Sequence, residues 1–397
     1  MGLLLRLVLL FFVSRHKTVF LDELDYDTIA VSLLKKHQYF MILGPTAFRP
    51  PAEPFFIAAV YATIGQAHQI VPLLHAVFLT AVPFLCAALG RRMGLSLWAA
   101  NTGALIASLH PGLAYAATTL YPTALTAVAL TAGLLCSSIA AENDCKAESV
   151  KGGLALGLAG SLTTTFVPLP LLAAAYCIWK RKMRAAVIIG ILGMTPALIW
   201  LIRNDIVFGE FTIATNGGMN LYLGANDDAT PLSGNWVRYM PPFDPGLTIA
   251  DEVALDHMYQ RYAKAWIHAH PARYAWLCVE RGVMVIDSVG RPKTGGIHSG
   301  LGEKVVGWSM LPLTLLSLVG LWFQRRKPAS FFTASALLLI AASSAFTLVK
   351  ARFRFPLDPA LDVFAVAAIA GILSLLGTSQ MHSKEASGSE NVTEATR

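Results

Sequence analysis

Four carboxylates within six residues form the densest cluster of reactive side chains in the sequence. Asp22, Glu23, Asp25 and Asp27 lie in the run DELDYD, with Tyr26 among them. A carboxylate within hydrogen-bond reach of a hydroxyl can take its proton as the oxygen attacks an electrophile. Acids at this spacing also cap a helix and complement its positive N-terminus. The residues alone therefore leave two interpretations of Asp22, a catalytic base and a helix cap.

Cationic side chains gather just before the last apolar segment of the chain. Lys350, Arg352 and Arg354 alternate there, and the planar guanidinium group suits bidentate contact with phosphate oxygens. The alternative is ordinary snorkelling of long basic side chains to lipid head groups. Arg203 is a candidate of the same kind. Arg49 is placed either to pair with an acid of the DELDYD run or to contact a phosphate.

Two surface helices are expected to position these groups. Tyr26, Ile29 and Leu33 recur at helical spacing after the acids, which predicts an amphipathic helix along the outer membrane surface. The apolar stretch 51–65 contains Glu53 and several prolines, so we expect a helix at the interface rather than a span. An acid so near lipid is costly unless it is paired or used, which makes Glu53 a candidate substrate-binding residue.

The rest of the chain is too apolar for a soluble protein. Hydrophobic residues make up 55% of the 397 and charged residues 14%, whereas soluble domains carry about 25% charged residues. The mean hydropathy is +0.56. Because a span needs roughly 20 apolar residues, we predict an all-α polytopic membrane protein with about ten transmembrane helices. The predicted spans are 2–14, 69–90, 95–113, 118–140, 151–166, 167–179, 185–202, 304–323, 330–348 and 357–377.

Basic residues in the short loops set the predicted orientation. Loops rich in lysine and arginine face the cytoplasm, which places both termini there and the acids on the outer face. The net charge of +7 comes chiefly from these loops. It does not indicate nucleic-acid binding, because no basic run is interleaved with aromatic residues. The loop residues are Arg91, Arg92, Lys146, Lys151, Lys180, Arg181, Lys182, Arg184, Arg325, Arg326 and Lys327.

This orientation divides the chain into four regions. Residues 1–202 form an N-terminal membrane core, whose first external loop, 14–68, carries the candidate catalytic acids. Residues 203–303 form a large external loop and 304–377 the C-terminal membrane helices. The tail 378–397, rich in Ser, Glu and Thr, is predicted to be disordered and cytoplasmic. The cations before the last span then face outward against the usual charge rule, which an anionic lipid head group at that face would explain.

The predicted spans lack the buried ionisable groups that are typical of ion-coupled transporters. Ion-coupled transporters need ionisable groups at membrane depth, and apart from Arg6 none lies in the middle of a span. This argues against a pump, but only weakly against a passive flippase. The sequence also lacks a CxxC pair and zinc-ligand spacing, so the residues predict no metal site.

Several stretches resemble one family of membrane enzymes. DELDYDTIAVSLL followed by FRPPAEPFFIAAVY resembles the first external loop of polyprenyl-phosphate-sugar-dependent glycosyltransferases of the C-type fold. This family includes protein mannosyltransferases and lipid A aminoarabinose transferases. Three further stretches resemble its bacterial members in the same order: RNDIVFGEFTIATNGGMNLYLGAND, AKAWIHAHPARYAWL and KARFRFPLDPALDVFAVAAI. The resemblance therefore extends over most of the chain.

The resemblance implies transfer of a hexose or pentose from a polyprenyl-phosphate donor on the outer face, with inversion at the sugar. The position matching the family's activating acid is Asp22, with Glu23 beside it and Tyr26 one turn later. The cations and Glu53 would then bind substrate, and the family likeness implies a bacterial inner membrane. The sugar and the acceptor, whether glycan, lipid or protein, are not indicated.

One departure from the family concerns a second acid. Some members carry one soon after the third span, where this chain reads HPGLAYAATTLYPTAL. His110 or Tyr121 could substitute there. We therefore expect no obligatory metal cofactor, with weak divalent-cation binding by Asp22 and Glu23 at most. Because this acid is missing, one alternative is that the chain is an inactive relative that keeps the fold. The alternative from another functional class is a non-enzymatic flippase, carrier or scaffold for lipid-linked glycans.

Overall fold

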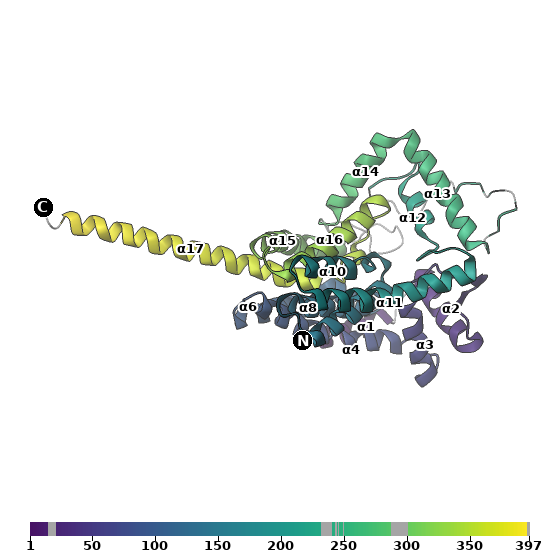
Figure 1. Ribbon diagram of the computed structural model, residues 1–397, viewed down its shortest axis with the longest axis horizontal. Coiled ribbons are helices and arrows are strands. Elements are labelled where there is room, and N and C mark those ends of the chain that lie inside the picture. The colour runs from purple at the N-terminus through teal and green to yellow at the C-terminus, as the bar shows by residue number, and fades with distance from the viewer. Residues whose placement is uncertain are drawn as a thin grey trace.

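The computed structural model describes residues 1–14, 21–231, 240–242, 244, 246–248, 250–286 and 301–394. Helices dominate this part of the chain (Figure 1), as the sequence predicts. The α-helices are α1 (Gly2–Ser14), α2 (Leu21–Lys36), α3 (Ala52–Ile64), α4 (Ile70–Phe78), α5 (Ala81–Arg92), α6 (Leu97–Leu109), α7 (Pro111–Ala116), α8 (Thr123–Asn143), α9 (Lys146–Leu162), α10 (Leu169–Trp179), α11 (Met183–Phe208), α12 (Gly217–Gly224), α13 (Glu252–Ala269), α14 (Pro271–Met284), α15 (Leu301–Phe323), α16 (Pro328–Phe346) and α17 (Asp358–Glu394). Short 3-10 helices occur at η1 (Thr164–Phe166) and η2 (Ala351–Phe353), and β1 (Phe40–Met41) pairs antiparallel with β2 (Gly44–Pro45).

Five helical segments of the described chain are long and apolar enough to cross a membrane. Shorter apolar helices accompany them, among them α3, α6 and the C-terminal part of α15. A polytopic helical protein is therefore confirmed as a class, whereas the count of ten spans stays a prediction. The five long segments are Ile70–Arg92, Thr123–Asn143, Met183–Phe208, Pro328–Phe346 and Asp358–Leu376.

Small residues let the membrane helices pack closely. A Cβ added to Gly157 in α9 would lie 2.9 Å from the carbonyl oxygen of Gly193 in α11. In the same way, a Cβ on Gly320 in α15 would lie 1.8 Å from the carbonyl oxygen of Phe364 in α17. Lipid supplies no hydrophobic force between helices, so close backbone approach of this kind holds a membrane bundle together.

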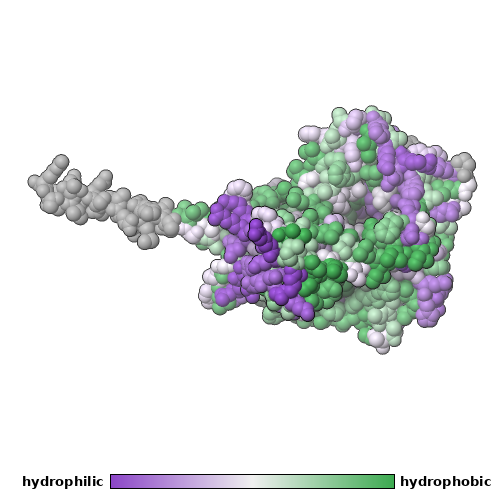
Figure 2. Space-filling view, in the orientation of Figure 1, coloured by the Kyte–Doolittle hydropathy of each residue, from purple (hydrophilic) through white to green (hydrophobic). Residues whose placement is uncertain are grey.

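The bundle has two polar ends with an apolar belt between them. Figure 1 shows α2, α3, α12 and α13 at one end, while the C-terminal part of α17 leaves the bundle at the other. On the face shown in Figure 2, hydrophilic residues gather at both ends and hydrophobic ones between. The three segments predicted to face outward, around the acids, after α11 and before α17, thus lie at a common end.

The two helices predicted after the first apolar segment both form, as α2 and α3, while their place at the membrane surface stays a prediction. The apolar face of α2 buries Tyr26, Ile29 and Ala30, partly against Ile57 and Tyr61 of α3. The helix α17 continues to Glu394, and the disorder expected of the tail stays a prediction.

Candidate active site

The carboxylate of Asp22 lies between two arginines. Its Oδ1 accepts a hydrogen bond of 2.7 Å from Arg49 Nη2, and its Oδ2 accepts one of 2.7 Å from Arg352 Nη2. Asp22 stands in the first turn of α2, and its side chain is 34% exposed. Both oxygens face guanidinium groups rather than the start of the helix, which favours an electrostatic or catalytic role over a helix cap.

Asp25 fixes the position of Arg49. Its Oδ2 accepts bonds from Arg49 Nε at 3.0 Å and from Nη2 at 2.7 Å. The guanidinium also lies over the rings of Tyr26 and Phe48, at 5.4 and 5.0 Å from their centroids. Arg49 therefore pairs with acids of the DELDYD run, the first of its two predicted roles. The sequence signal for Asp25 is its spacing of three from Asp22, which places both on one helix face.

Arg352 is held by an aromatic ring. Its guanidinium carbon lies 4.2 Å from the ring centroid of Tyr121, and Tyr121 packs edge-on against Tyr26 at 6.3 Å. The Nη1 of Arg352 is buried and makes no hydrogen bond within the described residues. Tyr121 is one of the two residues that could substitute for the missing acid, and in the structure its ring stacks on the guanidinium of Arg352. No local pattern marks it, because its partner is more than 200 residues away.

Burial and ion pairing together shape the titration of this cluster. Burial acts to raise the pKa of Asp22, but Arg49 and Arg352 hold it well below its usual value. Burial raises the pKa of Asp25, and Arg49 offsets only part of that effect. Burial, with help from Arg352, lowers the pKa of Lys350 to about 8. Asp22 is therefore firmly ionised, and Lys350 titrates near neutral pH.

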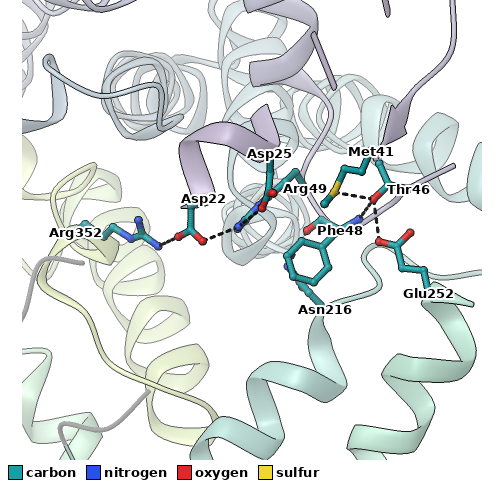
Figure 3. A network of polar contacts seen from close by, with 9 residues as sticks. All are labelled: Asp22, Asp25, Met41, Thr46, Phe48, Arg49, Asn216, Glu252 and Arg352. Atoms are coloured by element: carbon teal, nitrogen blue, oxygen red, sulfur yellow. Dashed lines mark hydrogen bonds and ion pairs between the residues drawn. The ribbon is translucent and has the colours of Figure 1, made fainter. Parts of the chain in front are cut away.

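A polar network ties the cluster to the segment that follows α11 (Figure 3). Glu252, at the start of α13, accepts bonds from Thr46 Oγ1 at 2.8 Å and from the Ala47 N–H at 3.2 Å. Asn216, before α12, donates to the Phe48 carbonyl at 2.7 Å. Residues 46–49 thus lie between Asp22 and the helices that follow α11.

Arg203 bonds the residues that flank the β1–β2 hairpin rather than the acid cluster. Its Nη1 donates to the Thr46 carbonyl at 2.8 Å, and its Nη2 donates to the Tyr39 carbonyl at 3.3 Å. Its guanidinium also lies over the rings of Tyr39 and Trp200. The predicted phosphate contact of Arg203 stays a prediction, since its described donors serve carbonyl groups.

Three other predicted site residues are buried. Glu23 is 1% exposed, Tyr26 5% and Glu53 0%. Glu53 Oε1 lies 3.0 Å from Nε2 of His75, which is also fully buried and bonds the Thr119 carbonyl through Nδ1. An acid in this position belongs to the helix packing. The direct substrate contact predicted for Glu53 has no support in this geometry.

Arg354 lies in a separate buried cluster. Its Nε donates to Asp358 at 2.7 Å, and its Nη1 donates to the carbonyls of Val285 and Ile286. His110 Nε2 lies 3.4 Å from the other oxygen of Asp358, and these residues line a small cavity with Asp362. The sequence alone singles out Arg354 and His110 but not Asp358 and Asp362, because each of these two acids stands alone within an apolar segment.

The arrangement of the acids bears on the expectation about a metal ion. Within the described chain, no group of three or more His, Cys, Asp or Glu side chains is arranged to hold one. Asp22 and Glu23 differ sharply in exposure, and both oxygens of Asp22 are occupied by arginine. Weak cation binding stays a prediction, and no chemical step below depends on it.

Comparisons with known proteins identify the fold. No protein-family model and no curated protein matches the chain. ArnT from Cupriavidus metallidurans, solved bound to undecaprenyl phosphate, is similar over 93% of this chain and 59% of its own, with 15% identity and a TM-score of 0.52. The archaeal oligosaccharyltransferase AglB from Archaeoglobus fulgidus was solved with an inhibitory peptide and a dolichol-phosphate. Its similarity extends over 91% of this chain and 47% of its own, with 11% identity and a TM-score of 0.46. The chain spans less than two thirds of either protein, and it shares the C-type membrane fold of ArnT.

Proposed function

We propose that this protein transfers a sugar from a polyprenyl-phosphate donor to an acceptor hydroxyl at the outer face of a membrane. The observation that carries the proposal is Asp22, a partly exposed carboxylate bound by two arginines at one end of the bundle. The fold shared with ArnT, which was solved with undecaprenyl phosphate, supports a lipid-phosphate donor. The charge pattern of the loops supports a bacterial inner membrane with both termini cytoplasmic.

The proposed reaction is a direct displacement with inversion. The acceptor oxygen attacks the anomeric carbon and its proton passes to Asp22, as in general-base catalysis. The bond between that carbon and the phosphate oxygen breaks, and its electron pair leaves on the polyprenyl phosphate. Arg49 and Arg352 stabilise the charge that develops there, because fixed cationic donors lower the barrier most where charge appears.

The other cations have supporting roles in this scheme. Lys350 adds positive charge beside the two arginines, whereas Arg203 and Arg354 hold backbone carbonyls of neighbouring segments. Tyr26 contributes a ring beneath Arg49. The donor's sugar, hexose or pentose, is left open, because none of these contacts selects one.

The test is transfer of label from a polyprenyl-phosphate sugar in membranes containing wild type or Asp22→Asn. The variant is nearly isosteric, so its expression and melting temperature should match wild type while transfer is lost. Asp27→Asn is the matched control, because Asp27 lies on the same helix but bonds Tyr61 and His68 instead. Unchanged transfer in a well-folded Asp22→Asn protein would exclude Asp22 as the base.

The same experiment addresses the non-enzymatic alternative. A flippase, carrier or scaffold would move or bind lipid-linked glycans without forming a new glycosidic bond. Absence of transfer from every donor, with lipid translocation intact in both wild type and Asp22→Asn, would favour that class over the enzyme.

A further inference from the structure

The resting arrangement poses a problem for a catalytic base. Both oxygens of Asp22 accept charged hydrogen bonds of 2.7 Å, and these bonds keep its pKa low. A carboxylate in this state is a weak proton acceptor. The same arginines that would bind the donor phosphate are therefore the groups that weaken the base.

The two arginines can change partners without losing their places. Arg49 keeps Asp25 as a second acceptor through Nε and Nη2, and it lies over the rings of Tyr26 and Phe48. Arg352 is stacked on Tyr121, and its Nη1 has no hydrogen-bond partner in the described chain. Neither guanidinium depends on Asp22 alone for its orientation. The Nη1 group of Arg352 can donate a further hydrogen bond to a ligand.

A lipid-linked sugar phosphate matches Asp22 in charge and in acceptor geometry. The donor is a phosphodiester, whose two non-bridging oxygens share one negative charge, as the two oxygens of a carboxylate do. Replacing Asp22 by this group between the arginines leaves the local charge on the arginines unchanged. After transfer the product is a phosphate monoester with greater negative charge, while Asp22 holds the acceptor's proton, so the total is again conserved.

We propose that the donor phosphate displaces Asp22 from Arg49 and Arg352, and that this displacement releases Asp22 as the base. This inference rests on the proposed function and adds an order of events to it. The base becomes competent only with the donor in place. Asp25 and Tyr121 keep the two guanidinium groups positioned during the exchange.

The exchange predicts that Asp22 competes with the ligand. We would measure binding of undecaprenyl phosphate to the detergent-solubilised full chain, comparing wild type, Asp22→Asn, Asp22→Ser and Asp27→Asn. Loss of a charged hydrogen-bond partner at each arginine should tighten binding about tenfold in both Asp22 variants. Asp27→Asn removes the same charge from the same helix without touching the arginines and should bind as wild type does. Melting temperatures establish that each variant is folded, and the serine variant covers a folding failure of the asparagine one.

The outcomes separate the exchange from the function. Equal or weaker binding by folded Asp22 variants overturns the exchange, as does equal tightening in Asp27→Asn, which would indicate only a general charge effect. In both cases wild type still binds the lipid, so the proposed function is not contradicted and only the exchange is. If wild type binds no undecaprenyl phosphate, the proposed function fails and the exchange fails with it.

Discussion

Arg352 donates to Asp22 at 2.7 Å although 330 residues separate them in the chain. The contact joins the turn before α17 to the first turn of α2, so that two segments far apart in the chain meet at one carboxylate. Arg49 completes the arrangement from the segment before α3. The proposed base and the two arginines proposed to bind phosphate thus lie within hydrogen-bond distance of one another.

Asp22→Asn should reduce the initial rate of sugar transfer by a hundredfold or more, because a positioned general base typically contributes about 10²–10⁴ in rate. The rate is measured with a labelled polyprenyl-phosphate sugar at saturating donor. The lipid's affinity should not fall, which distinguishes lost chemistry from lost binding. A drop of less than tenfold would assign proton transfer to another group.

Arg352→Lys should raise the KM for the donor about tenfold or more. Lysine keeps the charge, but it loses the planar fork and the stacking on Tyr121, and one charge-assisted hydrogen bond is worth roughly that factor. Donor titrations of wild type and variant give the KM. Arg326→Lys, an exposed residue at the opposite end of the bundle, serves as the control and should leave KM unchanged.

Lys350 should make lipid-phosphate binding pH-dependent. Its pKa is lowered to about 8, first by burial and then by Arg352, so the ammonium loses its proton as the pH rises through that value. Affinity for undecaprenyl phosphate should fall between about pH 7.5 and 9, while Lys350→Arg, always charged, should show a flat profile.

The effect of Lys350 on stability should have the opposite sign. Its pKa is lower in the folded protein than the ordinary 10.5, so above about pH 8 the unfolded chain binds more protons than the folded one. Stability therefore rises with pH between about 8 and 10.5. Melting temperatures of wild type and Lys350→Arg over this range test the sign, and a wild-type decline relative to the variant would contradict it.

Glu53→Gln should weaken the fold rather than the binding of donor. Glu53 and His75 are both fully buried and 3.0 Å apart, and disturbing one buried polar partner costs roughly 1–3 kcal/mol. We expect a lower melting temperature with an unchanged KM for the donor. A raised KM in a protein of normal stability would restore Glu53 to the substrate site.

How far the site could be predicted depends on the range of each contact. The amphipathic face of α2 and the spacing of Asp22 and Asp25 are local, so the sequence predicts them well. The meeting of Asp22 with Arg352, and the stacking of Arg352 on Tyr121, depend on how distant helices pack, and no local pattern encodes that. Glu53 is predicted to bind substrate because an acid so near lipid is costly unless it is paired or used, and its pairing with buried His75 depends on helix packing in the same way. Substrate contact by Tyr26 and Glu53 stays a prediction.

The bond between Asp22 and Arg352 also has a consequence for biosynthesis. Asp22 is made before its second arginine during translation, because Arg352 follows it by 330 residues. A ribosome-bound intermediate therefore holds the carboxylate without the second of the two arginines that we propose to bind phosphate. Catalytic competence should appear only when the last span has been inserted, which would keep unfinished chains from consuming the lipid-linked sugar pool.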